Sequence, residues 1–218
     1  MTATASRTAA HRPGTTSAPA PGIRLLLGCG TVAGLLFPVA SFAQAFTRTG
    51  FDLRRHGLSA LALGDLGWLQ IADFALTGLL ACAFALGVRR ATRRGVAGPL
   101  LIGVYGVAMV GGGFCTPDPA LGWPAGAPAG LPEHLSTAGA LHTVFGAAAF
   151  LSLIAAGLVF ARRFASRDWT AYSVIGSLAA FALTVPPWSE DSAGLRFAAA
   201  AALISAWLAA LSLRLRNH

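Results

Sequence analysis

The side chains in this sequence that could do chemistry are polar residues near the ends of long apolar segments. Histidine exchanges protons near neutral pH, carboxylates and serine can act with it in catalysis, and arginine binds anionic groups. An ionisable side chain inside a membrane helix costs about 2.5 to 3.5 kcal/mol, so it normally faces the bundle interior and finds a partner there. We therefore consider one candidate polar pocket, formed by Arg54, Arg55, His56, Ser59, Gln70, Asp73, Asp118, His142 and Arg196.

The spacing of these residues predicts similar depths below one face of a helical bundle. Asp73 lies nine residues into one predicted helix and His142 five residues into another, which gives depths of about 13 and 8 Å at 1.5 Å per residue. We expect Asp73 to pair with His142, Arg196 or water. The alternative is a buried hydrogen-bonded pair that fixes the helix register without a ligand. In the predicted pocket Asp73 lies at the floor, and the side chains of Ser59, Asp118, His142 and Arg196 converge around it.

Patterns typical of enzymes are weak in this chain. A zinc hydrolase needs three convergent ligands, but His56, His134 and His142 are spread over two connectors and one helix, without an HxxxH pair. A triad of Ser59, His142 and Asp118 is conceivable, although Ser59 is not in a GxSxG nucleophile elbow. The sequence has no phosphate-binding loop, GxGxxG or CxxC pattern, and its three cysteines are predicted to be buried thiols. We expect no metal and no cofactor.

The elements that position these side chains are predicted to be transmembrane helices. Of the 218 residues, 55% are hydrophobic and 11% are charged, whereas an average soluble chain has about 25% charged residues. A span needs about 20 apolar residues. The sequence predicts an all-α fold, a polytopic bundle of six transmembrane helices with spans at residues 25–46, 64–88, 99–115, 137–161, 171–187 and 195–213.

The arginines predict the orientation of this bundle. The net charge of +8 comes from arginines that flank apolar runs, without the basic and aromatic patch of a nucleic-acid-binding protein. Twelve arginines and one acid, Asp168, are on one side of the predicted bundle, and four arginines and six acids are on the other. Because cytoplasmic connectors carry the excess of basic residues, both termini are predicted to be cytoplasmic. An even number of spans agrees with this orientation.

The N-terminal region has two interpretations. Residues 1–21 are rich in Ala, Thr, Ser and Pro and predict a disordered tail, followed by a six-helix transmembrane domain over residues 22–215. Arg24, the apolar run, Pro38 and the triplet at 43–45 resemble a cleavable signal peptide. The apolar run is longer than the core of a usual signal peptide, so we favour a retained helix.

Glycines are placed where helices could approach closely. Gly30 and Gly34 form a GxxxG step in the first predicted span, and the third span is also rich in glycine. Small residues let helix backbones come together in a membrane, within one chain or between the copies of a homo-oligomer. The alternative is that a GC-rich genome encodes many glycines and alanines that have no role in helix packing.

Two stretches resemble the motifs of a known family. Residues 50–74, GFDLRRHGLSALALGDLGWLQIADF, resemble GFDLxRHxLSxLxLGxxGWxQxxNF, and residues 111–128, GGGFCTPDPALGWPAGAP, resemble GxFxxDPxxGxPxG. Both patterns belong to the bacterial membrane proteins grouped as domain of unknown function 998, and His142 resembles that family's histidine at the start of the fourth span. Asp73 stands where the family pattern has asparagine. The resemblance covers about residues 25–215 and implies a six-helix protein of the bacterial cytoplasmic membrane, with no assigned activity.

Three functions remain open at this point. The first is a non-enzymatic membrane protein whose outer-face polar pocket binds a small molecule, a lipid headgroup or a protein partner. The second is a small permease, which would need two copies because the chain shows no clear inverted repeat. The third is an intramembrane lipid-modifying enzyme that uses His142, Asp118 and Ser59. We favour the first, with membrane lipids as partners.

Overall fold

The computed structural model describes residues 20–92, 95–185 and 190–217. The predicted tail before residue 20 lies outside the described residues, as do Arg93 and Arg94. Within the described part the chain forms α-helices and one short 3₁₀ helix, η1, without strands, so the predicted all-α fold is confirmed. The elements are α1 (Pro21–Thr47), η1 (Leu58–Ala62), α2 (Gly67–Ala91), α3 (Ala97–Phe114), α4 (Thr137–Ala161), α5 (Arg167–Thr184) and α6 (Glu190–Arg216).

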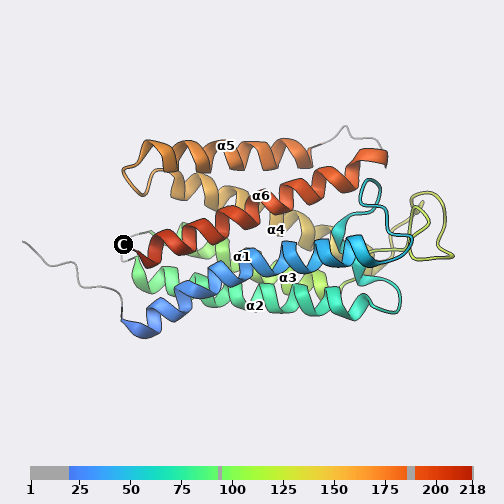
Figure 1. Ribbon diagram of the computed structural model, residues 1–218, viewed down its shortest axis with the longest axis horizontal. Coiled ribbons are helices and arrows are strands. Elements are labelled where there is room, and N and C mark those ends of the chain that lie inside the picture. The colour runs from blue at the N-terminus through green and yellow to red at the C-terminus, as the bar shows by residue number, and fades with distance from the viewer. Residues whose placement is uncertain (1–19, 93–94, 186–189, 218) are drawn as a thin grey trace, which may run out of the picture.

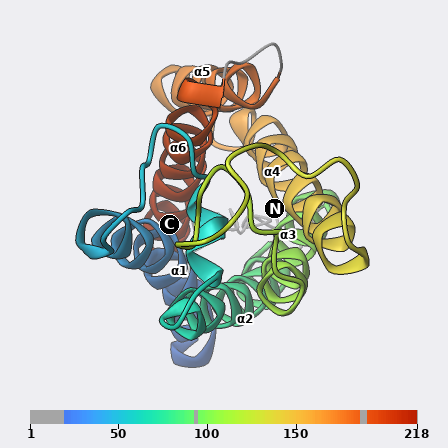
Figure 2. The ribbon, with the colours of Figure 1, turned by 90° about the vertical axis from the view of Figure 1, so that its right-hand side faces the viewer.

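The helices close into a ring. Each α-helix packs on the next one in sequence, and α6 returns to pack on α1 (Figure 2). Figure 1 shows α1 beginning at one end of the bundle and α6 ending there, beside the α2–α3 and α4–α5 connections. We call this the arginine-rich end, because it carries Arg24, Arg89, Arg90, Arg162, Arg163, Arg167, Arg214 and Arg216.

The opposite end is covered by two long connections, residues 48–66 and 115–136, which we call the cap. Figure 2 looks onto this end and shows the 115–136 connection lying across the ring, with η1 beneath it. The cap is therefore positioned to close the space between the helices from one side.

Five of the described helices are long and apolar enough to cross a membrane: α1, α2, α3, α4, and α6 over Asp191–Arg216. The chain thus has the helices of a multi-pass membrane protein. The remaining helix, α5, has 18 residues and begins with Arg167 and Asp168, which lower its apolar content. The fifth predicted span, at 171–187, is thus present as a helix, but its composition alone does not qualify it as a span.

The helix boundaries differ from the predicted spans mainly where polar residues extend a helix. The predicted span at 137–161 coincides with α4. Helix α5 begins four residues before the predicted 171, because the Ser166 hydroxyl accepts a hydrogen bond from the Trp169 amide at 3.3 Å and caps the helix. Helix α6 likewise begins at Glu190 rather than 195. Apolar content marks where a helix is buried in lipid, whereas backbone hydrogen bonds decide where it ends.

Helix α1 is an integral wall of the ring. Gly34 lies so close to α6 that an added Cβ would stand 2.5 Å from the Ser205 carbonyl oxygen. The predicted close approach at this glycine therefore occurs within the chain. Two hydrogen bonds of Ser212 on α6, to the Leu27 carbonyl at 2.6 Å and to the Thr31 hydroxyl at 2.7 Å, tie the same two helices together. Removing α1 would therefore open the ring.

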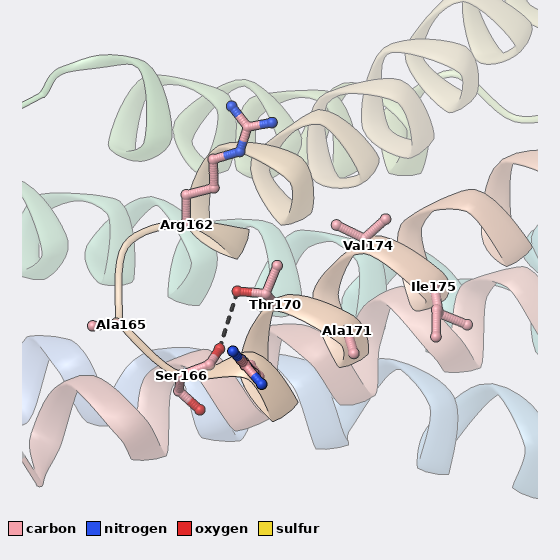
Figure 3. Close-up of a pocket in the computed structure, with 8 residues that line it drawn as sticks. Arg162, Ala165, Ser166, Thr170, Ala171, Val174 and Ile175 are labelled. Atoms are coloured by element: carbon pink, nitrogen blue, oxygen red, sulfur yellow. Dashed lines mark hydrogen bonds between the residues drawn. The ribbon is translucent and has the colours of Figure 1, made fainter.

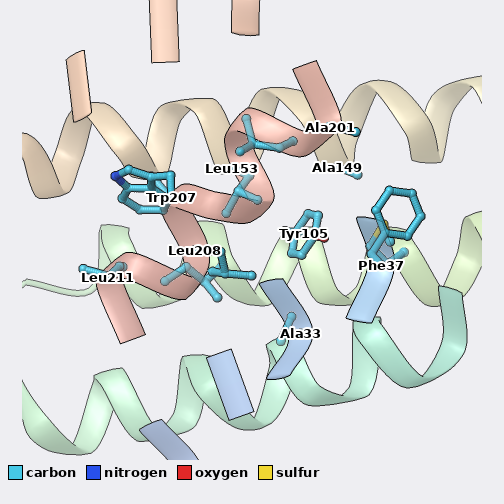
Figure 4. Packing of buried hydrophobic residues seen from close by; sticks show 14 of the residues in the cluster. Ala33, Phe37, Tyr105, Ala149, Leu153, Ala201, Trp207, Leu208 and Leu211 are labelled. Carbon is cyan, nitrogen blue, oxygen red and sulfur yellow. The ribbon is translucent and has the colours of Figure 1, made fainter. Parts of the chain in front are cut away.

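Large side chains fill the middle of the ring. Figure 4 shows Trp207, Leu208 and Leu211 of α6 gathered with Leu153 of α4 and Tyr105 of α3. Leu208 and Leu211 are completely buried. This core occupies the bundle between the arginine-rich end and the region beneath the cap.

Candidate functional site

The two segments of the cap are fastened to each other. The Trp123 indole N–H donates to the Ala60 carbonyl at 2.8 Å, and the Arg48 guanidinium lies 5.0 Å from the centre of the Trp123 ring. Arg48 also donates to the carbonyls of Leu61 and Leu63. Burial lowers the pKa of the Arg48 guanidinium, while the charge of Asp65 raises it. These contacts make the segments one rigid cover.

His56 belongs to this fastening. Its Nδ1 accepts a hydrogen bond from the Asp52 amide at 2.9 Å, so its Nε2 carries the proton and donates to the Leu121 carbonyl at 3.1 Å. The ring is buried and lies beside Phe51 and Trp123. Both nitrogens are therefore occupied, and His56 joins the two cap segments rather than offering a free group.

A cavity of about 950 Å³ lies beneath the cap. Its lining comes from the cap, from η1 and from all six α-helices. Most of the lining is apolar, with aromatic and aliphatic side chains at the level of the helices. The predicted site residues that line it are Arg55, His56, Ser59, Asp118 and His142.

His142 presents one unused nitrogen at this cavity. Its Nδ1 lies 3.0 Å from the Gly112 carbonyl oxygen and 2.7 Å from that of Cys115, and both oxygens can only accept. Nδ1 therefore carries a proton, and in the neutral form of the ring Nε2 is an acceptor. No partner for this Nε2 occurs among the described residues. His142 thus satisfies carbonyls at the end of α3 and retains an acceptor for a ligand.

Asp118 lies at the beginning of α4. Its Oδ2 accepts from the Ser136 amide at 2.9 Å, where the negative charge is favourable beside the helix N-terminus. A Cβ at position 139 would collide with the Asp118 carboxylate, so a larger residue there would displace this side chain from its present position. Ser59 is half-buried at the same cavity, and Arg55 Nε lies 3.5 Å from Asp191 Oδ1.

The cavity reaches the protein surface between α4 and α5. Leu151 of α4 and Phe181 of α5 both line it, with 53% and 45% of their surfaces exposed. Near the arginine-rich end the two helices are joined instead, where the Trp169 indole donates to the Phe160 carbonyl at 2.9 Å. Figures 1 and 2 both show α4 diverging from α5 toward the cap. From the exposed lining residues of α4 and α5 we infer a side opening of the cavity between these two helices.

Asp73 belongs to a separate group between α1 and α2. It is 4% exposed, and it accepts hydrogen bonds from Ser41 at 3.2 Å, Gln70 at 3.5 Å and Thr77 at 3.3 Å. Gln70 also accepts from the Gln44 amide at 2.8 Å. We call these five residues the α1–α2 polar cluster. None of them is among the residues that line the cavity. The described hydrogen bonds of Asp73 go to Ser41, Gln70 and Thr77 instead of the expected His142 or Arg196.

Arg196 and Arg54 also lie apart from the cavity lining. Arg196 donates to the carbonyls of Ala182 at 3.0 Å and Leu183 at 3.3 Å, and so covers the C-terminal end of α5, where a positive charge is favourable. Arg54 is exposed, and its carbonyl accepts from the Gly194 amide at 3.0 Å. Both arginines hold helix ends and connections in place.

The sequence interpretation missed Ser41, Gln44 and Thr77. A signal for them exists, because residues 70, 73 and 77 share one helix face and residues 41 and 44 share another. Matching these two polar faces would have paired α1 with α2. Within the described part of the chain, no group of three or more His, Cys, Asp or Glu side chains could hold a metal ion.

Comparison with known proteins returns one family. The family described as "Protein of unknown function (DUF998)" matches residues 31–214, in agreement with the resemblance of the two motifs. No curated protein and no solved structure matches the chain.

Proposed function

This chain belongs to the DUF998 family of proteins of unknown function, and we propose that it is a six-span protein of the bacterial plasma membrane that binds an amphipathic lipid beneath its cap. The observation that carries this proposal is the cavity of about 950 Å³, because it combines apolar walls, a few polar groups at one end and a side opening. A volume of this size is in the range of small-molecule sites, which are mostly apolar with few polar groups.

The six-span topology is supported by the course of α5. This helix packs on both α4 and α6, and Figure 1 shows it running alongside them. The start of α1 and the end of α6 both lie at the arginine-rich end, and the excess of arginine there supports a cytoplasmic position for this end. The cap then faces outward.

Cysteine labelling tests this orientation. We expect Ala129→Cys in the cap to react with a membrane-impermeant maleimide in intact cells, and Val96→Cys at the arginine-rich end to react only after lysis, in a chain whose native cysteines are alanine. Both positions are exposed. Reaction of Val96→Cys alone in intact cells would contradict the topology.

The polar end of the cavity favours a headgroup that donates hydrogen bonds. His142 Nε2 is an acceptor, and the Asp118 carboxylate accepts as well. Deeper in the ring the walls include Phe37, Met109 and Ile204, which suit an apolar chain. We infer a ligand with an acyl chain and a hydroxyl- or amine-bearing headgroup. The opening between α4 and α5 lets such a ligand enter sideways from the membrane.

The two competing functions have less support. No hydrogen bond joins Ser59, His142 and Asp118 in the described structure, and the His142 proton is held by backbone carbonyls instead of a carboxylate. This arrangement favours binding over acid–base catalysis. A permease needs a path to the other end, where buried Leu208 and Leu211 fill the ring (Figure 4).

Binding of a defined probe tests the proposed function. We would measure the affinity of a pyrene-labelled monoacylglycerol for the full chain in phosphatidylcholine nanodiscs. His142→Phe removes the acceptor while keeping a ring of similar size, and we expect it to weaken binding about tenfold. Arg196→Gln alters a polar residue near the cap but outside the cavity lining, so it serves as the matched control. Equal affinities of wild type and His142→Phe, or an equal loss in Arg196→Gln, would contradict the proposal.

A further inference from the structure

A second depression lies at the arginine-rich end, where α4 ends and α5 begins. It has a volume of about 590 Å³ and is lined by eight residues between positions 162 and 175, which Figure 3 draws as sticks. We call it the α4–α5 groove. It is distant in the fold from the cavity beneath the cap, and no part of the proposed function uses it.

The groove has a charged end and an apolar end. Arg162 and Arg167 are exposed where the chain connects the two helices. Val174 and Ile175 continue the groove along α5, and Ile175 is 66% exposed. The Thr170 hydroxyl donates within the groove wall, to the carbonyls of Ala161 at 2.7 Å and Ser166 at 3.0 Å. The guanidinium groups are therefore the main polar groups that the groove offers to a ligand.

Both arginines are available for an anionic partner. No ion pair to Arg162 or Arg167 occurs among the described residues. The connection and first turn of α5 also contain Arg163, against a single acid, Asp168, so this region is positively charged. Guanidinium groups bind phosphate through charge-assisted, often bidentate hydrogen bonds.

The groove is held in shape by contacts within its wall and behind it. The Ser166 cap, the Thr170 hydroxyl and the Trp169 indole, which donates to the Phe160 carbonyl, fix the connection to both helices. The Arg214 guanidinium of α6 lies 4.9 Å from the centre of the Phe164 ring and 5.1 Å from that of Trp169. The backbone of the groove is therefore held in place before a ligand binds, and binding would require little further ordering of the protein.

We propose that the α4–α5 groove binds an anionic phospholipid from the membrane leaflet at the arginine-rich end. The phosphate binds at the charged end of the groove, which Arg162 and Arg167 supply, and an acyl chain follows Val174 and Ile175 along α5. Charge complementarity favours this occupant, because basic pockets between membrane helices attract anionic headgroups. The apolar strip formed by Val174 and Ile175 can pack against an acyl chain. A zwitterionic lipid brings no net negative charge to offset the two arginines.

Lipid retention measures this directly. Full-length protein would be extracted from membranes with equal parts phosphatidylglycerol and phosphatidylcholine, and the co-purified lipids quantified by mass spectrometry. We expect wild type to retain phosphatidylglycerol preferentially, and Arg162→Gln/Arg167→Gln to lose about 25-fold of that preference, from about fivefold for each arginine beside an anionic leaflet. Ala171→Trp fills the groove without changing its charge and is expected to lose the same preference.

The matched control is Arg89→Gln/Arg90→Gln, which removes two exposed arginines at the same end of the bundle, on α2. It is expected to keep the preference. An equal loss of the phosphatidylglycerol preference in the control would show that anionic lipids are attracted to basic residues in general. That result would overturn the proposed site. Displacement of phosphatidylglycerol by inorganic phosphate alone, or retention by Ala171→Trp, would also overturn it, because the apolar strip would then contribute nothing. Association of two chains through this face in place of lipid, seen by native mass spectrometry, would reject the proposal as well.

Discussion

The α1–α2 polar cluster and the cavity beneath the cap are both polar regions inside an apolar bundle, but they differ in what their polar groups contact. In the cluster, Asp73 and Gln70 take their hydrogen bonds from neighbouring side chains, and Gln70 is completely buried. At the cavity, His142 keeps an acceptor beside open volume. The cluster holds two helices together, whereas the cavity has room for a ligand.

This difference shows that burial of a charged residue does not identify a binding site. Asp73 is the most costly side chain to place in the bundle, since a carboxylate in a span must be stabilised by its surroundings. The structure stabilises it with Ser41, Gln70 and Thr77, and none of these side chains lines the cavity beneath the cap. His142 is less deeply buried and forms fewer contacts with side chains, and for that reason it is the better candidate to bind a ligand.

The sharpest test of the contrast enlarges one small residue in each region. Ser41 on α1 is completely buried in the cluster, so Ser41→Phe is expected to cost more than about 3 kcal/mol of unfolding free energy through overpacking and lost hydrogen bonds. Ala201 on α6 lines the cavity, so Ala201→Phe should fold normally and abolish binding of the pyrene-labelled probe. Denaturant titration in micelles measures the first effect. Equal destabilisation by both changes would mean that the cavity is closed in solution.

A smaller effect is expected from replacing a polar residue by leucine. Gln70→Leu keeps the volume but leaves Ser41, Gln44 and Asp73 without their shared partner, which should lower the unfolding free energy by about 2 to 4 kcal/mol. His142→Leu loses only bonds to backbone carbonyls and should cost about 1 kcal/mol. The same titration compares them. If His142→Leu lowered the unfolding free energy more than Gln70→Leu, the main role of His142 would be structural.

The smallest effect belongs to Asp73→Asn. An asparagine carbonyl can accept from Ser41 and Gln70, and its amide can donate to the Thr77 hydroxyl, so the cluster keeps its bonds without a buried charge. We expect a change within about 1 kcal/mol, with ligand binding unaltered. The family pattern, which has asparagine at this position, agrees with this expectation. A loss of probe binding in Asp73→Asn would show that the α1–α2 polar cluster affects ligand binding at the cavity. The two regions would then not be functionally separate.

Much of the fold could be predicted from the sequence, because apolar length and arginine placement follow directly from the physics of a membrane. The boundaries of α4 coincide with the prediction, and α1, α2 and α3 differ from it by a few residues at each end. The start of helix α5 was harder to predict, because its N-terminal turn contains the charged residues Arg167 and Asp168. Its first residue depends on the cap formed by the Ser166 hydroxyl.

The candidate site could be predicted only in part. Depth along a helix placed Ser59, Asp118 and His142 near one level, and the structure brings them to one cavity. Depth does not give rotation about the helix axis, and that rotation turns Asp73 toward α1 instead of the cavity. The partners of His56 are backbone groups of Asp52 and Leu121, and those of Arg196 are backbone carbonyls at the end of α5; side-chain patterns do not reveal either set.

The ring closes through the contact between the first helix and the last, and this has a consequence for biosynthesis. Ser212 bonds to the Leu27 carbonyl and the Thr31 hydroxyl, partners that lie more than 180 positions earlier in the chain. At about 5 to 20 residues per second, roughly 10 to 40 seconds of translation separate them. During that interval Gly34 and its neighbours, which later press against α6, face lipid or the insertion machinery. A chain that terminates before α6 therefore leaves an open seam, and quality-control proteases that sample membrane helices could distinguish it from the finished protein.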